Sequence, residues 1–431
     1  MANKAINSAI RHFDSTYAKY FGFQWPSARI GLLSPKKYCL IANSFVAQPK
    51  ETEGSLDLSS YYKRHLRRYS KGQQESVTNQ DPAKTKPQAD SEITSDGGLS
   101  SAEDLIHMFS DRRVDENDKF FINRASTMLS LNDFVPATEL ITKEDLHGVS
   151  TYYDDATSLD LDIARLEEPP LEFSEQLRIF VFPRGSWSKF DAPETDQAEL
   201  MSHYLMDGAS ILPVLALNVQ LDDICADFCA APGGKSLAML MTLRPRHLLC
   251  NDSSSSRLGR MYSLMRQYLP DVTYVRDTLR LSNRDAANFI QKDAFDKILV
   301  DVPCSNDRHS VENEENSIFS RKRLNERLSL PEKQTSILTS ALKSVRPGGS
   351  VVYSTCTMSP LENDNVVQKA LMGLQVEGYN ARFGIVSLKE AFRPLRGLFN
   401  FHTKLQYGQL VVPNLMNNFG PMYISKISRI S

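Results

Sequence analysis

The chain has 431 residues, 41% of them hydrophobic and 24% charged, so it can bury a large core and hold one big domain with an appendage. No uninterrupted apolar run approaches the roughly 20 residues that a membrane helix needs, which predicts a soluble protein without a membrane partner. The net charge of −2 excludes nucleic-acid binding through a positive field over the whole molecule and leaves only local basic patches.

Residues 1–70 predict a mainly helical extension. Its start, MANKAINSAIRHF, carries Lys4 and Arg11 before the first acidic residue, Asp14, which fits the end of a mitochondrial presequence and equally an ordinary amphipathic helix. A basic aromatic segment, YYKRHLRRYSK, follows at 61–71. Cations beside aromatic rings suit phosphates and stacked bases, but a solvated helix face explains the same pattern. The candidate RNA contacts in this segment are Tyr61 or Tyr62, Lys63, Arg64, Arg67 and Arg68.

The composition changes after residue 70. Residues 71–101 are dominated by Gln, Ser, Asp, Thr, Lys and Pro, so they cannot bury enough apolar surface to order themselves and predict a flexible linker. Residues 102–175 form an acidic segment of undefined role. From 176 to 431, apolar runs alternate with helical patterns, which predicts an α/β domain whose parallel sheet is covered by helices on both faces. The candidate strands are 223–228, 247–251, 272–276, 297–302, 350–355 and 421–427.

The stretch DFCAAPGGKSLAML, residues 227–240, leads from a buried strand into a helix through a glycine turn. Gly233 and Gly234 let the backbone approach a ligand, and the helix that follows offers unpaired amides, which suits a nucleotide-like cofactor. A glycine pair alone equally permits a plain tight turn. The next apolar run ends in Asp252, 18 residues beyond Gly234, where a carboxylate commonly binds ribose hydroxyls.

Three further apolar runs also end in polar or reactive side chains. They end in Asp277, in Asp301 followed by Cys304, and in Cys356, which stands 52 residues after Cys304. Because ligands bind outside the carboxyl ends of parallel strands, these side chains are expected to converge on one crevice. The cysteines show no C-x-x-C spacing and no histidine nearby, which predicts a reducing compartment and no metal site. Three other cysteines are expected to be buried as small apolar side chains: Cys39, Cys225 and Cys250.

Three motifs, DFCAAPGGK, DVPCSNDRHS and YSTCTMSPLENDNVV, resemble in order and spacing the Nop2/Sun family of RNA cytosine-5 methyltransferases. The resemblance is strongest to the mitochondrial ribosomal-RNA members and covers roughly residues 10–70 and 176–428. It implies a Rossmann-like sheet of the S-adenosylmethionine-dependent methyltransferase type at 176–431. Further stretches carry it: RKRLNERLSLPEKQ, HYLMDGASILPVLAL, WPSARIGLLSPKKY and LVVPNLMNNFGPMY.

The resemblance also implies roles for the acidic residues. Asp252 would hold the ribose of the cofactor with Arg257 beside it, and Asp277 would flank the adenine. Asp301 would face both the cofactor and the base, and Lys235 would order the carboxylates. The cofactor loop of the family falls on Cys229, Ala230, Ala231, Pro232, Gly233, Gly234 and Lys235.

The two strand-end thiols suit covalent catalysis. Carbon 5 of cytosine is a poor nucleophile, so a thiolate first adds to carbon 6, the methyl group is transferred to carbon 5, and a base then removes the carbon-5 proton to expel the thiol. Asp301 near ring nitrogen 3 would stabilise the charge that develops. By resemblance Cys356 is the nucleophile and Cys304 the releasing group, whereas DNA cytosine methyltransferases attack from a Pro-Cys position like that of Cys304. Further basic candidates for RNA contact follow the second motif: Arg321, Lys322 and Arg323.

The resemblance implies an enzyme of the mitochondrial matrix that acts on small-subunit ribosomal RNA, with an added role in ribosome assembly. It also implies a protein partner of the mitochondrial transcription-termination-factor family, because no stretch predicts a separate RNA-binding module. The alternatives are a transfer-RNA or other RNA substrate, a non-catalytic assembly scaffold, and a DNA or small-molecule methyltransferase. A scaffold would be expected to lack a thiol or the cofactor acid, and this chain has them all.

Overall fold

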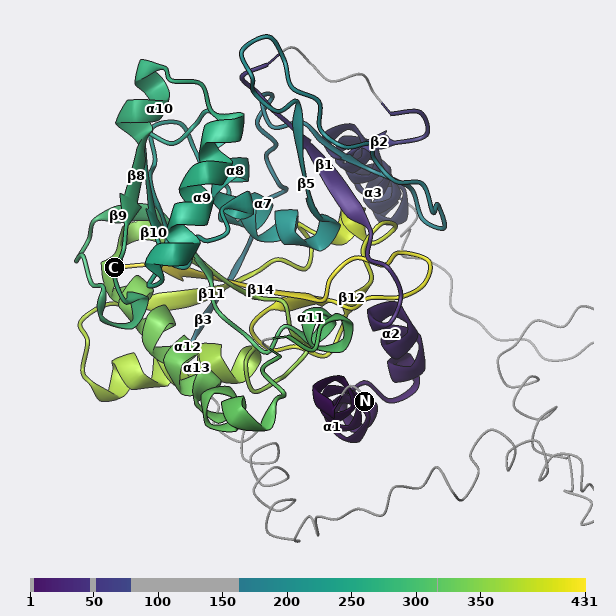
Figure 1. The fold of residues 1–431 in the computed structure, drawn as a ribbon, viewed down its shortest axis with the longest axis vertical. Helices are drawn as coiled ribbons and strands as arrows, with labels where there is room; N and C mark the ends of the chain where they lie inside the picture. The colour runs from purple at the N-terminus through teal and green to yellow at the C-terminus, as the bar shows by residue number, and fades with distance from the viewer. Residues whose placement is uncertain (1–3, 47–51, 79–162, 316) are drawn as a thin grey trace, which may run out of the picture. The chain divides into compact units, whose positions relative to one another are not determined.

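The computed structural model describes residues 4–46, 52–78, 163–315 and 317–431 (Figure 1). Residues 1–75 and 159–431 form one compact unit, and the elements below belong to it. Residues 79–162, which hold most of the predicted linker and acidic segment, lie outside the described residues. No helix within the described ranges is long and apolar enough to cross a bilayer.

The main sheet has ten strands within the described part of the chain. Its order is β12-β13-β14-β10-β9-β6-β7-β8, with β11 beside β14 and β3 beside β11. The five strands from β10 to β8 run parallel, and β14 is antiparallel to β10. The bounds are β3 Ala164–Glu167, β6 Ile224–Asp227, β7 His247–Asn251, β8 Leu279–Ser282, β9 Phe295–Asp301, β10 Val345–Thr355, β11 Phe383–Ser387, β12 Phe401–His402, β13 Gln409–Val411 and β14 Met422–Arg429.

Both faces of this sheet are buried. In β9, Ile298 and Val300 belong to one buried cluster and Leu299 to the other, as expected when successive side chains point to opposite faces. One cluster includes residues of α12 and α13, and the other includes residues of α7, α8 and α9, which lie across the strands from them in Figure 1. The predicted fold class is therefore confirmed. These helices are α7 Leu212–Leu217, α8 Gly234–Leu240, α9 Ser255–Tyr268, α12 Leu324–Ser344 and α13 Asp364–Val376.

The amino-terminal segment supplies helices and also a strand. Helix α1 buries a stripe of side chains four residues apart, from Ala5 to Phe21, which is the pattern of an amphipathic helix. Strand β1 lies between β4 and β5 in a second, antiparallel sheet of order β2-β4-β1-β5. This segment therefore shares a sheet with later residues. The bounds are α1 Lys4–Phe21, α2 Trp25–Leu32, α3 Leu58–Thr78, β1 Tyr38–Ala42, β2 Leu56–Asp57, β4 Ile179–Val181 and β5 His203–Asp207.

Two boundaries differ from those expected from composition. Helix α3 continues to Thr78, so the boundary expected at residue 70 lies inside a helix. Strand β3, within the segment expected at 102–175, pairs in parallel with β11 and belongs to the main sheet. Strand β3 has only four residues, and its pairing with the distant strand β11 is a contact that composition does not report.

The strand predicted at 272–276 is wrong. This stretch belongs to a helix, α10 Thr273–Thr278, and the strand β8 follows it. The β-branched and aromatic residues of the stretch suggested a strand, but its buried side chains, Val275 and Thr278, have the spacing of a helix. The real strand, LRLS, lies at the edge of the sheet, where short strands with charged side chains are common.

Candidate active site

The carboxyl ends of four parallel strands form one polar edge. Strands β6, β9 and β10 end at Asp227, Asp301 and Thr355, and β7 ends at Asn251. The strand register puts Asp301 opposite Ser354 and joins β6 to both β7 and β9. The structure therefore brings together the loops that carry the predicted cofactor and thiol residues, as expected for an open α/β sheet.

The cofactor turn requires both of its glycines. Gly233 has a φ of +114°, which side chains of L-residues rarely adopt. A Cβ on Gly234 would stand 2.8 Å from a ring carbon of Tyr204, and one on Gly233 would stand 3.0 Å from Met261. The turn is therefore close-packed on one side, which leaves its backbone as the surface that a ligand would meet.

Asp252 lies beside this turn, directly after β7. Its side chain is 2% exposed, and Oδ1 accepts a hydrogen bond of 2.9 Å from the amide of Ser254. Arg257 lies 3.5 Å from the other carboxylate oxygen and also donates to the carbonyl of Ala231 in the cofactor turn. The structure thus joins Asp252, Arg257 and the cofactor turn, as the motif resemblance implied.

Lys235 and Asp301 link the cofactor turn to the thiol loops. Lys235 Nζ lies 2.6 Å from Asp301 Oδ2, and Ser354 donates to Oδ1 at 2.7 Å. Burial lowers the pKa of Lys235, but the charge and hydrogen bond of Asp301 outweigh it and raise the pKa above its usual value. Lys235 is therefore a stable ammonium group that fixes the Asp301 carboxylate.

The two strand-end thiols meet. Their sulfurs are 3.1 Å apart, well beyond the S–S length of about 2.05 Å in a disulfide, so Cys304 and Cys356 are both free thiols. The amide of Cys356 also donates to Cys304 Sγ at 3.4 Å. The hydrogen bond to Cys356, burial, and the nearby charges of Cys356 and Glu362 raise the pKa of Cys304 well above its usual value. Cys304 is therefore held as a protonated thiol against the Cys356 sulfur.

Three buried acidic residues at this edge were not singled out from the sequence. Glu362 accepts hydrogen bonds of 2.9 Å from the Ser305 amide and from Gln334. Burial raises the pKa of Asp227 and of Asp307 to about 7. All three stand inside or beside the quoted motifs, but a motif does not show which of its polar residues are buried.

Asp277 does not lie where the sequence suggested. It belongs to α10, ahead of β8, and its carbonyl accepts from His247 Nδ1 at 3.2 Å, where β7 begins. The loop after β8 instead approaches Asp252, because Asn283 Nδ2 donates to the Asp252 carbonyl at 2.7 Å. The expected adenine-side position of Asp277 followed from the strand that proved to be a helix.

The predicted RNA contacts lie on two different elements. Tyr62 is 1% exposed and donates to the Ala391 carbonyl at 2.9 Å, so it is a core residue and not a stacking platform. The Tyr61 ring is half-buried and stacks on His65. Arg323, in the 3₁₀ turn before α12, pairs with Glu326 through two of its nitrogens. The remaining candidates are exposed on their elements: Lys63, Arg64, Arg67, Arg68, Arg321 and Lys322.

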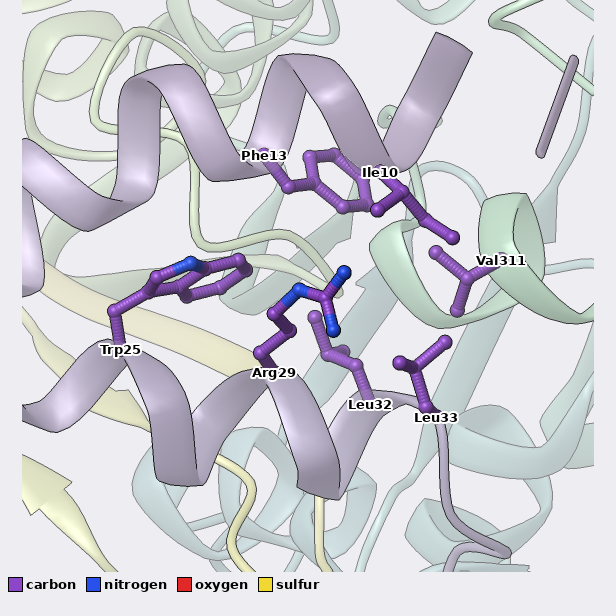
Figure 2. Close-up of a pocket in the computed structure, with 7 residues that line it drawn as sticks. All are labelled: Ile10, Phe13, Trp25, Arg29, Leu32, Leu33 and Val311. Atoms are coloured by element: carbon purple, nitrogen blue, oxygen red, sulfur yellow. The ribbon is translucent and has the colours of Figure 1, made fainter. Parts of the chain in front are cut away.

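A small apolar pocket lies away from these residues, between α1, α2 and the helix α11 Asp307–Glu312 (Figure 2). The one charged group that lines it, Arg29, is already paired with Asp14 at 2.8 Å. None of the predicted site residues lines this pocket, so it marks the packing seam of α1. Its lining is Ile10, Phe13, Trp25, Arg29, Leu32, Leu33 and Val311. No cluster of three side chains suited to a metal ion occurs within the described ranges.

A family model described as 16S rRNA methyltransferase RsmB/F matches residues 214–383. The 5-cytosine rRNA methyltransferase NSUN4 of Mus musculus is 34% identical over 428 residues, which cover 99% of this chain and 90% of that protein. The nsun-4 enzyme of Caenorhabditis elegans, with the same description, is also 34% identical and covers 98% and 91%. The chain belongs to the Nop2/Sun family. Its members transfer a methyl group from S-adenosylmethionine to carbon 5 of cytosine in RNA, and this one is close to NSUN4.

A third relative matches a shorter part of the chain. The mitochondrial tRNA (cytosine(34)-C(5))-methyltransferase of Danio rerio is 40% identical over 237 residues, which cover 54% of this chain and 62% of that protein. The family prediction made from three motifs is confirmed, and so is the prediction of an S-adenosylmethionine-dependent RNA methyltransferase.

Proposed function

We propose that this protein methylates carbon 5 of a cytosine in ribosomal RNA of the mitochondrial matrix. The observation that carries the proposal is the pair of thiols 3.1 Å apart, joined through Ser354 and Asp301 to Lys235 of the cofactor turn. The ribosomal substrate is supported by the description of the NSUN4 relatives, and the compartment by that of the Danio rerio relative.

The residues of the turn fit S-adenosylmethionine, which supplies an electrophilic methyl group on a sulfonium. Gly233 and Gly234 let the turn pack closely against Met261 and Tyr204, which a Cβ would crowd. Asp252 offers a carboxylate for ribose hydroxyls. Asp227 Oδ1 is buried without a hydrogen-bond partner among the described residues, so it can accept from a bound ligand. We assign the adenine to the loop after β8, at 283–285, in place of Asp277.

Cys356 is the nucleophile. The two sulfurs lie 3.1 Å apart, and the pKa of Cys304 is raised well above its usual value, so Cys304 keeps its proton while Cys356 attacks as the thiolate. That thiolate adds to carbon 6 of the cytosine, and the electron pair of the 5,6 double bond becomes available at carbon 5. Asp301 is held between Lys235 and Ser354, and a proton shared between its side chain and ring nitrogen 3 stabilises the negative charge that develops there.

Cys304 serves the release step. Its sulfur lies 3.1 Å from the Cys356 sulfur, so Cys304 stands beside the covalent intermediate once Cys356 is bonded to carbon 6. It can then take the proton from carbon 5, after which the carbon–sulfur bond breaks and Cys356 leaves as a thiolate.

The proposal includes a role in ribosome assembly and a protein partner of the mitochondrial transcription-termination-factor family, which would direct the enzyme to its site. RNA contacts are assigned to the exposed cations of α3 and of the turn before α12. A methyltransferase acting on transfer RNA remains the alternative, because the Danio rerio relative has that description.

Mapping of 5-methylcytosine in mitochondrial RNA from cells with and without the protein tests the proposal. We expect one ribosomal cytosine to lose its methyl group and to regain it when the parent chain is restored, but not when Cys356→Ala is restored. Loss confined to transfer RNA would support the alternative. An assembly defect with unchanged methylation would overturn the enzymatic proposal in favour of a scaffold.

A further inference from the structure

A buried carboxylate joins the two cysteine loops. Asp307 stands three residues after Cys304 and is 0% exposed. Its Oδ1 accepts from the hydroxyl of Thr357 at 2.7 Å, and its Oδ2 accepts from the amide of Met358 at 2.8 Å. Thr357 directly follows Cys356 in the chain. The loop of one cysteine therefore holds the loop of the other through two hydrogen bonds to one buried carboxyl group.

A second link crosses between the same loops. Ser305, directly after Cys304, donates from its hydroxyl to Thr357 Oγ1 at 2.9 Å. The Ser305 amide is itself held by Glu362 at 2.9 Å. The residue that follows Cys304 is thus hydrogen-bonded to the residue that follows Cys356. This bond restrains the distance between the two sulfurs although it involves neither of them.

The amino-terminal helix completes this cluster. The hydroxyl of Tyr17 in α1 donates to Asp307 Oδ2 at 3.1 Å and lies 3.3 Å from Thr357 Oγ1. Tyr17 is 1% exposed, and its ring stacks on Phe13, which faces α11 across the seam in Figure 2. A residue 290 positions away in sequence is therefore bonded to the same carboxylate that joins the cysteine loops.

This cluster is costly for stability alone. Burial of Asp307 disfavours its charge and raises its pKa, and an apolar side chain of the same size would avoid that cost. The carboxyl group instead fixes how separate segments are oriented, because its two oxygens accept from donors on α1 and on the turn after Cys356. Reacting groups that are misplaced by about 1 Å can lose about 100-fold in rate.

We propose that Asp307, anchored by Tyr17 of the amino-terminal helix, is a positioning residue that sets the separation of the Cys304 and Cys356 sulfurs. This proposal deepens the proposed function and rests on it for its catalytic consequence. The geometry itself does not depend on which RNA is methylated. Helix α1 is thereby part of the catalytic apparatus and not only an extension of the fold.

The rate at which the two thiols form a disulfide falls when they move apart, so it reports on their placement. A diazene-type oxidant such as diamide takes two electrons and two protons from the pair, so that one S–S bond forms and the oxidant becomes a hydrazine. Peptide mass mapping identifies the Cys304–Cys356 product and separates it from reactions of other cysteines. We expect Asp307→Asn to slow this oxidation about 10-fold and to lower kcat about 10- to 100-fold, with the KM for S-adenosylmethionine unchanged.

Matched variants separate position from stability. Tyr17→Phe and Tyr62→Phe each remove the hydroxyl of a tyrosine that is 1% exposed, but the Tyr62 hydroxyl bonds to Ala391 and Leu171 instead of the cysteine loops. We expect similar losses of melting temperature and a slower oxidation only for Tyr17→Phe. Thr357→Val should slow oxidation, and Thr357→Ser, which keeps the hydroxyl, should restore it.

The outcomes are distinct. Oxidation rates of Asp307→Asn and Tyr17→Phe equal to those of the parent would overturn the positioning proposal, whatever the enzyme methylates. Equal slowing by Tyr17→Phe and Tyr62→Phe would also overturn it, because general loosening would then explain the effect. Slower oxidation in a protein whose parent form methylates no RNA would leave the positioning intact and overturn the proposed function.

Discussion

The two halves of the active site differ in how far along the chain their contacts reach. In the cofactor half, Ser236 bonds to Asp227 over nine residues, and Arg257 bonds to Ala231 over 26. In the thiol half, Tyr17 bonds to Asp307 over 290 residues. The cofactor half is therefore built within one strand–turn–helix region and its neighbour. The thiol half is held by elements from both ends of the chain, so it is expected to be the more sensitive to distant changes.

The buried guanidinium of Arg308 illustrates the long reach of the thiol half. It follows Asp307 in α11 and donates to carbonyls of Gly31 and Ser34 near the end of α2. It also donates to the carbonyl of Gly420, just before β14. The loop that carries Cys304 is thus tied to the amino-terminal helices and to the last strand at once.

Lys235→Met is expected to have the largest effect, because Lys235 is the direct link between the halves. Its loss leaves Asp301 without the ammonium at 2.6 Å, and we expect kcat to fall about 100- to 1,000-fold while the fold is kept. Lys343→Met is the matched control, since Lys343 pairs with Glu377, a half-exposed carboxylate on the surface. Equal activity of the two variants in a tritiated methyl transfer assay would mean that the link is not used.

Asp252→Ala should weaken S-adenosylmethionine binding without changing the thiol half. Hydrogen bonds to a charged group contribute about 1.5–3 kcal/mol, so their loss should raise the Kd about 10- to 100-fold. Calorimetry measures this Kd. Asp277→Ala is the matched control and should bind as the parent does, because Asp277 lies in α10 ahead of β8. The reverse result would show that the proposed placement of the adenine at the loop after β8 is wrong.

The position of Asp277 shows which parts of the site could be predicted from the sequence and which could not. The cofactor turn, Asp252, Asp301 and both cysteines were predicted because each stands at the end of an apolar run whose burial pattern is local. Asp277 was misplaced because Val272 and Val275 favour a strand on composition, and only packing against the sheet decides for a helix. The bond between Tyr17 and Asp307 could not be predicted, since no local pattern reports which helix a buried carboxylate will meet.

A smaller effect is expected at the RNA surface, which belongs to neither half. The double change Arg67→Gln and Arg68→Gln on α3 removes two exposed cations. In a plot of the logarithm of the RNA-binding constant against the logarithm of the salt concentration, the slope should become shallower by about one unit for each phosphate that is no longer neutralised. Arg323→Gln should change it less, because Arg323 is already paired with Glu326. Fluorescence anisotropy over a range of salt concentrations measures both. A larger effect of Arg323→Gln would assign the RNA to the turn before α12.

Deletion of residues 79–101 should have the smallest effect. The prediction rests on composition alone, because a polar stretch with few apolar side chains contributes little to a core. We expect the melting temperature to change by less than about 2 °C and methyl transfer to be kept. A large loss of activity would show that the thiol half reaches further along the chain than its hydrogen bonds indicate.

The central claim is that Cys356 attacks the base and Cys304 releases the product. Its most direct test is the covalent protein–RNA adduct seen on a denaturing gel after incubation with substrate RNA and S-adenosylmethionine. Cys304→Ser is predicted to accumulate the adduct, because attack and methylation proceed but proton removal is slow. Cys356→Ser is predicted to give none, since a serine hydroxyl is hardly ionised at neutral pH. An adduct with Cys356→Ser and none with Cys304→Ser would contradict the account and assign the attack to Cys304.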